Sequence, residues 1–412
     1  MGLNHRLRPA KDASALYAGN LALEHFRNLS STRSAQFKQS PGADNLGTIA
    51  PFSRVCVIVA GFLYECAEAA HARADGASTE NRCVTTETVL ITGGAGYIGS
   101  HVVQQLLDAG TPLVVLDDLS TGFRDALQGA PLVQGNTGDA DLVGRVLRDY
   151  RVATVLHFAA RTIVPESVAD PLRYYANNAC ATRTLLEGCV RNGVKRFVFS
   201  STAAVYGIPE DGRVGEDAPT HPINPYGSSK LMSEWMLRDL DANGSMRHVI
   251  LRYFNVAGSD RQGRIGQSTR NATLLFKVAC EVATGQRDHV DIFGTDYATP
   301  DGTGVRDYIH VEDVATAHLR ALEYLRDGGA STTLNCGYGH GYSMREVIAA
   351  VERAHGARLR AVERPRRAGD PPSLIADVAR IGRVLQWTPR HDDLDVIAAT
   401  SLAWERRLAQ AR

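Results

Sequence analysis

The chain has 412 residues, of which 44% are hydrophobic, and its 45 basic and 45 acidic residues give a formal net charge of zero. This length and apolar content allow two or three domains with a sizeable core, and the balanced charge provides no overall attraction to nucleic acid or to an anionic membrane. The seven cysteines include no C-x-x-C pair, so neither a zinc site nor a redox motif is predicted and no metal is expected.

Residues 1–85 precede every recognisable motif and are interpreted as an N-terminal extension, disordered or accessory. A transit peptide and a true translation start near Val84 are the other readings of this segment. The apolar run at 55–64 is too short to span a bilayer and too far from the N-terminus for a secretory signal, so no membrane segment is expected. A reducing, cytoplasmic compartment is predicted, with buried cysteines in apolar helical patterns at Cys180, Cys189 and Cys280.

A β-branched run at 87–92 has the pattern of a buried strand, and a helical pattern over 97–109 follows it. The glycines between and within them, Gly93, Gly96 and Gly99, have the spacing G-x-x-G-x-x-G. The first permits a tight turn, the second lets a pyrophosphate approach the backbone, and the third lets the helix pack closely on the strand. The free N–H groups of the helix N-terminus then face the phosphates, so a dinucleotide site is predicted.

The second strand, near 112–116, leads to Asp117, about 20 residues after the glycine loop, where a carboxylate can accept hydrogen bonds from the adenosine ribose. Asp118 follows with no nearby basic pair that would bind a 2′-phosphate, so the expected cofactor is NAD rather than NADP. The continuing alternation predicts an α/β fold, a doubly wound parallel (Rossmann) sheet over 86–255. Further strands are expected near 131–134, 153–158, 195–200 and 247–252, with helices near 139–150, 172–191 and 226–241.

Tyr226 and Lys230 are four residues apart in the last of these helices and therefore share one face. A nearby ammonium favours the phenolate, which lowers the pKa of a tyrosine from about 10 toward the range that a general base needs. Thr202 follows the strand at 195–200, at the sheet edge where ligands bind, so its hydroxyl is expected beside Tyr226. Together with the glycine loop, these residues indicate a nicotinamide enzyme that moves a proton and a hydride at one carbon.

Residues 256–412 are expected to form mainly a smaller substrate-binding lobe, with some segments returning to the Rossmann domain. The Gly-, Ser- and Arg-rich stretch at 256–268 is predicted to be a loop that closes over a nucleotide. The ligands are expected in the cleft between the two lobes. Helices are predicted near 271–285, 312–326 and 344–355, mixed with short strands.

From about residue 88 to about residue 404 the chain resembles the UDP-glucose 4-epimerases, which are extended short-chain dehydrogenase/reductases. The run at 301–310 is the most specific part of this resemblance. The other segments that carry it are 91–100, 157–160, 200–207, 225–230, 252–255 and 366–370.

The resemblance implies an NAD-dependent 4-epimerase that interconverts UDP-glucose and UDP-galactose through a 4-keto intermediate, with UDP-N-acetylhexosamines as further expected substrates. It implies that Tyr226 is the base, that Lys230 tunes it and binds the nicotinamide ribose, and that Thr202 hydrogen-bonds the sugar oxygen. A surface ion pair between Arg306 and Asp307 is the competing reading of that arginine. The implied cofactor contacts are Gly93, Gly96, Tyr97, Ile98, Gly99, Asp117, Asp118, Asn136, Thr137, Phe158, Ala159, Ala160, Asn177, Tyr226, Lys230 and Phe254. The implied UDP-sugar contacts are Thr202, Tyr226, Asn255, Arg306, Arg367, Asp370 and Leu374.

The chain departs from the family pattern at a few positions. Asn136 and Thr137 stand where many relatives have Asp-Ile, and Thr162 stands where some have a lysine. Leu274 and Leu374 replace polar or aromatic residues on the substrate side. In relatives, the helices near 172–191 and 226–241 form a four-helix dimer interface, so the resemblance also implies a homodimer.

Two other functional classes compete with this reading. A nucleotide-sugar 4,6-dehydratase needs an acid pair beside the threonine, where this chain has Ala203 and Ala204. A non-catalytic NAD-sensing regulator has no need to keep Thr202, Tyr226 and Lys230 together.

Overall fold

A computed structural model describes residues 87–269, 272–367 and 369–411, which belong to one compact unit. The extension expected at 1–85 lies outside the described residues. Within the described part, no helix combines the length and the apolar character that crossing a membrane requires.

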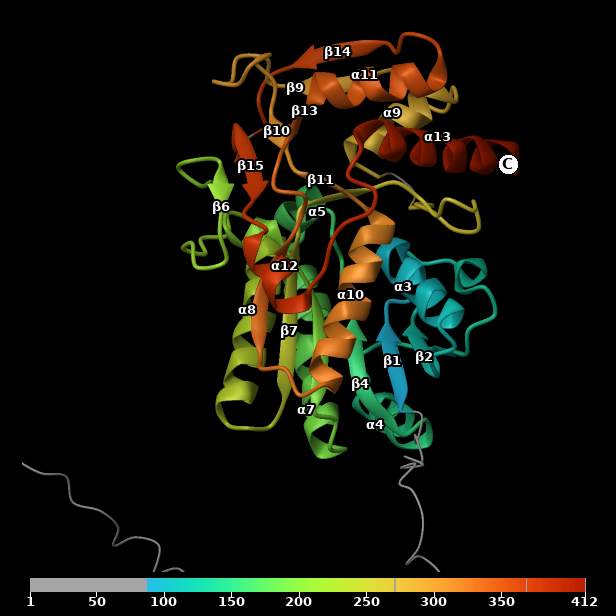
Figure 1. The fold of residues 1–412 in the computed structure, drawn as a ribbon, viewed down its shortest axis with the longest axis vertical. Coiled ribbons are helices and arrows are strands. Elements are labelled where there is room, and N and C mark those ends of the chain that lie inside the picture. Colours follow the sequence, from blue (N-terminus) through green and yellow to red (C-terminus); the bar gives the residue numbers. More distant parts are fainter. Residues whose placement is uncertain (1–86, 270–271, 368, 412) are drawn as a thin grey trace, which may run out of the picture. The chain divides into compact units, whose positions relative to one another are not determined.

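A seven-stranded sheet forms the centre of the fold, with the strand order β12-β7-β5-β4-β1-β2-β3 and every neighbouring pair parallel (Figure 1). The doubly wound α/β prediction is therefore confirmed. Successive residues of β1 face two different apolar layers: Val89 and Ile91 belong to one buried cluster and Leu90 to the other. The strands are β1 (Thr88–Thr92), β2 (Leu113–Asp117), β3 (Leu132–Gln134), β4 (Val152–His157), β5 (Arg196–Thr202), β7 (Arg247–Tyr253) and β12 (Thr332–Cys336).

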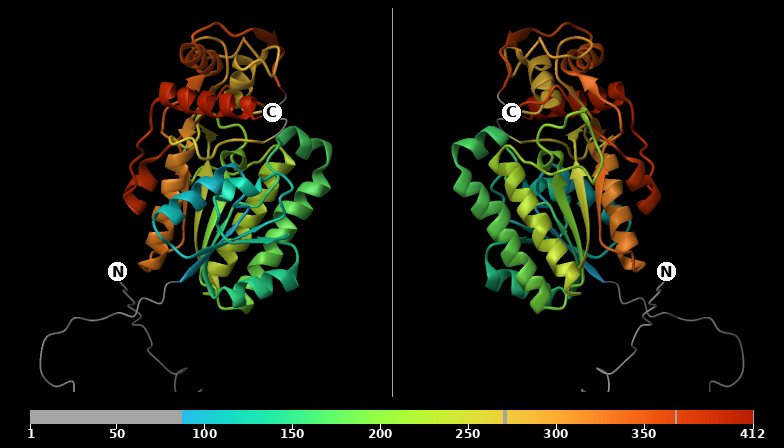
Figure 2. Two further views of the ribbon diagram at one scale, coloured as in Figure 1. Left: turned by 90° about the vertical axis from the view of Figure 1, so that its right-hand side faces the viewer. Right: turned by 90° about the vertical axis from the view of Figure 1, so that its left-hand side faces the viewer.

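Helices cover both faces of this sheet, as Figures 1 and 2 show. On one face lie α3 (Tyr97–Asp108) and α10 (Val311–Arg326), whose apolar residues join the cluster of Val89. The other face carries α4 (Ala140–Asp149), α7 (Ala181–Arg191) and α8 (Pro225–Ala242).

The helix predicted near 172–191 is not continuous. It consists of α6 (Pro171–Tyr174), a π-helical turn (Tyr175–Cys180) and α7, and a short α5 (Val164–Ala169) precedes it. A π-turn is irregular and often lies at a functional site. This irregularity also corrects one burial prediction: Cys180, at the end of the π-turn, is exposed, whereas Cys189 and Cys280 are buried as predicted.

The C-terminal lobe stands beyond the carboxyl ends of the central strands, at the top of Figure 1. A four-stranded sheet contains β13 (Tyr342–Ser343), β10 (Val305–Arg306), β15 (Ser373–Ala376) and β6 (Arg213–Val214). Two two-stranded sheets pair β14 (Ala361–Arg364) with β9 (Val290–Phe293), and β11 (Tyr308–His310) with β8 (Asn255–Ala257). The remaining helices are α9 (Leu275–Ala283), α11 (Met344–His355), α12 (Ala379–Leu385) and α13 (Leu394–Gln410).

Candidate functional site

A cavity of about 1370 Å³ lies at the carboxyl ends of the central strands and is also lined by the C-terminal lobe. Its volume exceeds the few hundred to about 1,000 Å³ of a site for one small ligand, so a dinucleotide and a second ligand can share it. Every residue that the sequence assigns to the cofactor or to the sugar nucleotide lines this cavity.

The glycine loop forms a cradle that only glycine permits. Gly93 has a φ of +70°, and a Cβ there or at Gly99 would overlap backbone atoms of Ala159 or of the loop itself. Gly96 is the N-cap of α3 and has no side chain to occupy the first turn of that helix. These residues therefore fit a pyrophosphate, and they meet the requirement for holding NAD.

Asp117 and Asp118 lie at the end of β2, beside the cradle. Asp117 accepts hydrogen bonds from the backbone N–H groups of Ala95 and Leu119 at 2.9 and 2.8 Å, so it also fixes the shape of the glycine loop. Burial raises the pKa of Asp117. Burial also acts to raise the pKa of Asp118, but hydrogen bonds from Ser120 and Asn136 and the charge of Arg161 bring it below its ordinary value.

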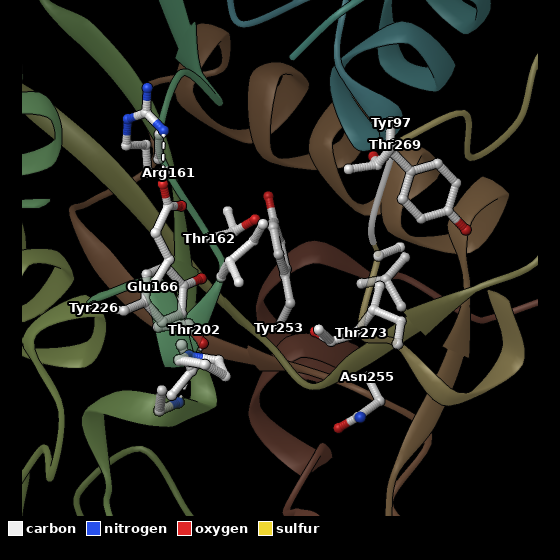
Figure 3. Close-up of a pocket in the computed structure, with 18 of the residues that line it drawn as sticks. Tyr97, Arg161, Thr162, Glu166, Thr202, Tyr226, Tyr253, Asn255, Thr269 and Thr273 are labelled. Carbon is white, nitrogen blue, oxygen red and sulfur yellow. Dashed lines mark hydrogen bonds and ion pairs between the residues drawn. The ribbon is translucent and has the colours of Figure 1, made fainter. Parts of the chain in front are cut away.

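Tyr226 and Lys230 project from the first turns of α8 toward the end of β5. Asn224 caps the helix by accepting from the N–H of Gly227 at 2.9 Å. The Nζ of Lys230 donates to the carbonyl oxygen of Ser200 at 2.7 Å, and a hydrogen bond joins Thr202 to Tyr226. The structure thus brings together the threonine, the tyrosine and the lysine, as Figure 3 shows for Thr202 and Tyr226.

The electrostatics at this triad differ from the sequence-based expectation. Burial raises the pKa of Tyr226, and the hydrogen bond with Thr202 lowers it only in part. Burial also lowers the pKa of Lys230 to about 7, against the opposing charge of Glu234. The sequence argument considered the charge of Lys230 alone, whereas desolvation has the larger effect on both groups.

The far end of the cavity carries the residues assigned to the sugar nucleotide. Arg306 lies 3.8 Å from Asp370, and the guanidinium of Arg367 stacks on the ring of Phe293 at 3.6 Å. The alternative prediction, a surface ion pair between Arg306 and Asp307, is wrong. The carboxylate of Asp307 is fully buried, and its described hydrogen bonds all come from backbone N–H groups. Two guanidiniums at one end of a cavity suit a diphosphate, since each can donate two parallel hydrogen bonds.

Sequence reasoning missed several residues that line the cavity. The side chains of Arg161 and Glu166 form an ion pair at 3.2 Å, visible in Figure 3, and Tyr174 donates to the same carboxylate at 2.9 Å. The signal for Arg161 was available, because a charged residue soon after a buried strand is a candidate in any open α/β sheet. Thr269 and Thr273 also line the cavity, but they stand in a stretch without periodicity. Among the residues that the structure describes, no group of histidine, cysteine or acidic side chains could hold a metal.

Known proteins that are similar to this chain agree with this geometry. The model of the NAD dependent epimerase/dehydratase family matches residues 89–337. The chain is 57% identical to a UDP-glucose 4-epimerase of Azospirillum brasilense over 324 residues, which covers 78% of this chain and 93% of the relative.

Two solved structures are also similar. One is UDP-glucose 4-epimerase from Bifidobacterium longum in complex with NAD+ and UDP, with a TM-score of 0.74, 38% identity and coverage of 78% of this chain and 98% of that chain. The other is the UDP-Glc/GlcNAc 4-epimerase from Campylobacter jejuni, with a TM-score of 0.69, 45% identity and coverage of 78% and 99%.

Proposed function

The chain belongs to the NAD dependent epimerase/dehydratase family, and from this membership we propose that it is an NAD-dependent UDP-glucose 4-epimerase, an isomerase that interconverts UDP-glucose and UDP-galactose through a 4-keto intermediate. The observation that carries the proposal is the gathering of Thr202, Tyr226 and Lys230 beside the glycine cradle in one cavity. The 4,6-dehydratase is not favoured, since Ala203 and Ala204 line the cavity next to Thr202. A regulator that only senses NAD is not favoured either, because the relatives are named as epimerases.

The chain's own residues divide the chemistry between the two ends of the cavity. The glycine cradle, Asp117 and Lys230 would hold NAD, which supplies reversible hydride transfer at the sugar C4′ when bound. The phenolate form of Tyr226 takes the proton of the 4′-hydroxyl, and Thr202 holds the same oxygen in place. After the keto sugar turns about its link to UDP, C4′ presents its other face to the returning hydride, and Tyr226 gives the proton back to the 4′-oxygen.

The nucleotide must stay fixed while the sugar turns. Arg306, Arg367 and Asp370 would hold UDP at the far end of the cavity, and Asn255 would contact it from β8. Because these contacts anchor the diphosphate rather than the hexose, the hexose keeps the freedom to present either face to the cofactor.

The direct test is to incubate the purified protein with UDP-galactose and to resolve the product sugar. The expected product is UDP-glucose, in an equilibrium that is also reached from UDP-glucose. A 4-keto-6-deoxy product would identify a dehydratase instead. Bound NAD without any turnover would identify a regulator.

A homodimer is the proposed assembly, supported by an apolar surface shared by adjacent helices. Val168 of α5, Leu172 of α6 and both Met232 and Trp235 of α8 are exposed, Leu172 by 77% and Trp235 by 50%. Exposed large side chains that adjoin one another usually mark an interface. The expected result is that light scattering at micromolar concentration finds a dimer.

Replacing Leu172 by glutamate should convert that dimer to a monomer, because an unpaired carboxylate cannot be buried at an apolar interface without a large free-energy cost. Tyr150→Glu is the control, since Tyr150 is 38% exposed but lies at the end of α4. A wild-type monomer, or a Leu172→Glu variant that remains dimeric, would contradict the proposed surface.

The sugar pocket is proposed to accept UDP-N-acetylglucosamine as well as UDP-glucose. Leu374 of β15 lines the cavity opposite Arg306 in the strand register, at a position where some relatives have tyrosine. The similarity to the UDP-Glc/GlcNAc 4-epimerase of Campylobacter jejuni supports this breadth. Leu374→Tyr should therefore reduce kcat/KM for the acetamido sugar by about 10- to 100-fold relative to UDP-glucose, the range of pocket-size effects of about 1–3 kcal/mol. Equal ratios of kcat/KM in the two proteins would refute this role.

The proposed domain organisation is an N-terminal extension at 1–85, the NAD-binding domain at 86–255 and mainly the UDP-sugar lobe at 256–412. The matches to relatives support the first boundary, because the family model begins at residue 89. A cytoplasmic location is proposed on the free thiols of the described cysteines.

A further inference from the structure

A buried ion pair lies one helical turn beyond Lys230. Glu234 of α8 and Arg252 of β7 are 0% and 1% exposed. The Nε and Nη2 of Arg252 donate to the two carboxylate oxygens of Glu234 at 2.9 and 2.6 Å, the fork geometry of a strong pair. The hydroxyl of Ser201 donates to the same carboxylate at 2.6 Å. The carboxylate of Glu234 is therefore held in one orientation inside the protein.

This pair and Lys230 attach α8 to the same strand ends. Lys230 donates to the carbonyl of Ser200, and the next residue, Ser201, donates to Glu234. Ser201 stands directly opposite Arg252 in the register of β5 and β7. Two successive turns of α8 thus bind the ends of two neighbouring strands, so the position of Lys230 depends on the carboxylate one turn below it.

Glu234 is also the only anion among the described groups that face Lys230. Burial lowers the pKa of His157 to about 3 and raises that of Tyr253, so both are neutral near pH 7. Glu234 pairs with Arg252 and also with the guanidinium of Arg238, one turn further along α8, at 2.9 Å. Lys230 donates to Ser200 and lies over the ring of Phe199, both of β5, and it interacts electrostatically with His157 of β4 and Glu234 of α8.

We propose that Glu234 is a positioning residue for the epimerase reaction: its carboxylate, anchored by Arg252 and Ser201, holds Lys230 as an ammonium ion against the end of β5. This inference rests on the proposed function. A lysine buried without an anion would lose its proton near or below neutral pH. Burial already brings the pKa of Lys230 to about 7, and the charge of Glu234 acts in the opposite direction.

The test is the pH dependence of turnover in Glu234→Gln, which keeps the shape of the side chain but removes its charge. Because the loss of the anion lowers the pKa of Lys230 further, the ammonium disappears at lower pH. The alkaline limb of the kcat profile should move down by about one pH unit, while kcat at pH 6 stays within about threefold of wild type. KM for UDP-glucose should change little, since Glu234 does not line the cavity.

A second variant separates this role from simple stabilisation of the fold. In Glu234→Met/Arg252→Met both charges are removed together, and such replacement of a buried pair is often neutral for stability. The alkaline limb is expected to move in the same direction in this double variant, but by less than in Glu234→Gln, because the opposing charge of Arg252 is removed as well. The double variant therefore decides the question if the single variant does not fold. An unshifted profile in the double variant, or in a folded single variant, would overturn the proposal, whether kcat is unchanged or uniformly reduced.

The chain offers a matched control in a second buried ion pair, between Lys277 of α9 and Glu405 of α13. Lys277 is 4% and Glu405 1% exposed, and neither lines the large cavity. Glu405→Gln should lower the melting temperature and leave the pH profile of kcat in place. Wild-type activity on UDP-galactose is measured in the same series. If the wild type is inactive, the proposed function fails; if it is active and the variants show no shift, only this inference fails.

Discussion

Replacing Tyr226 by phenylalanine should lower kcat by about 10²- to 10⁴-fold, the usual contribution of a positioned general base. Phenylalanine keeps the ring that fills this buried site at the start of α8 but cannot take the proton of the 4′-hydroxyl. Thr202 loses one hydrogen-bond partner and still accepts from the N–H of Ala204 at 3.1 Å, so the fold should be retained.

The measurements are kcat with UDP-galactose, the NAD content of the purified protein and the melting temperature. NAD content should match wild type, because the glycine cradle and Lys230 are untouched. Tyr206→Phe is the matched control: this buried tyrosine lies nearby and donates to Asn335 at 2.6 Å, but it does not line the cavity. Near-normal turnover in Tyr226→Phe would rule out this tyrosine as the base.

Gly99→Ala should abolish retention of NAD and lower the stability of the protein by about 1–3 kcal/mol, the cost of inserting a methyl group into a packed site. The added Cβ would overlap the carbonyl oxygen of Gly93 and lie 2.9 Å from the Cα of Gly94. Backbone cannot move aside as the end of a flexible side chain can, so the cradle must open. An open cradle no longer presents its N–H groups to the pyrophosphate.

NAD released on denaturation, assayed after gel filtration, checks the first effect, and thermal unfolding checks the second. Gly382→Ala serves as the control. Gly382 lies inside α12, where alanine is favoured over glycine, and the added Cβ would meet only the carbonyl oxygen of Trp387, at 3.9 Å. Normal NAD content in Gly99→Ala would show that the helix does not need to approach the loop so closely.

The sequence predicted six of the seven central strands because these strands are short apolar runs, whereas β12 was not predicted. β1 and β2 illustrate this, since each is buried almost throughout and leads to a residue that lines the cavity: Gly93 directly follows β1, and Asp117 is the last residue of β2. The π-turn at 175–180 could not be predicted in the same way, because its apolar spacing still resembles a helix. Its irregularity depends on tertiary contacts, such as the hydrogen bond from Asn178 to Ser229 at 3.0 Å.

The electrostatics of the site escaped sequence reasoning for a different physical reason. A spacing of four residues places Lys230 near Tyr226, but it gives no measure of how much water either group loses. Burial of both side chains decides the direction of their pKa shifts, and burial is a property of the assembled fold. The pairing of Glu234 with Arg252 is similarly hidden, because 18 residues of chain separate the partners.

The place of β12 in the sheet has a consequence for the way the chain folds during synthesis. β12 comes from residues 332–336, yet it covers the side of β7 that faces away from β5. Until those residues have left the ribosome, the N–H and C=O groups on that side of β7 form an unpaired edge. Such edges pair readily with other chains, so the nascent protein should depend most on chaperones after β7 has emerged and before β12 follows.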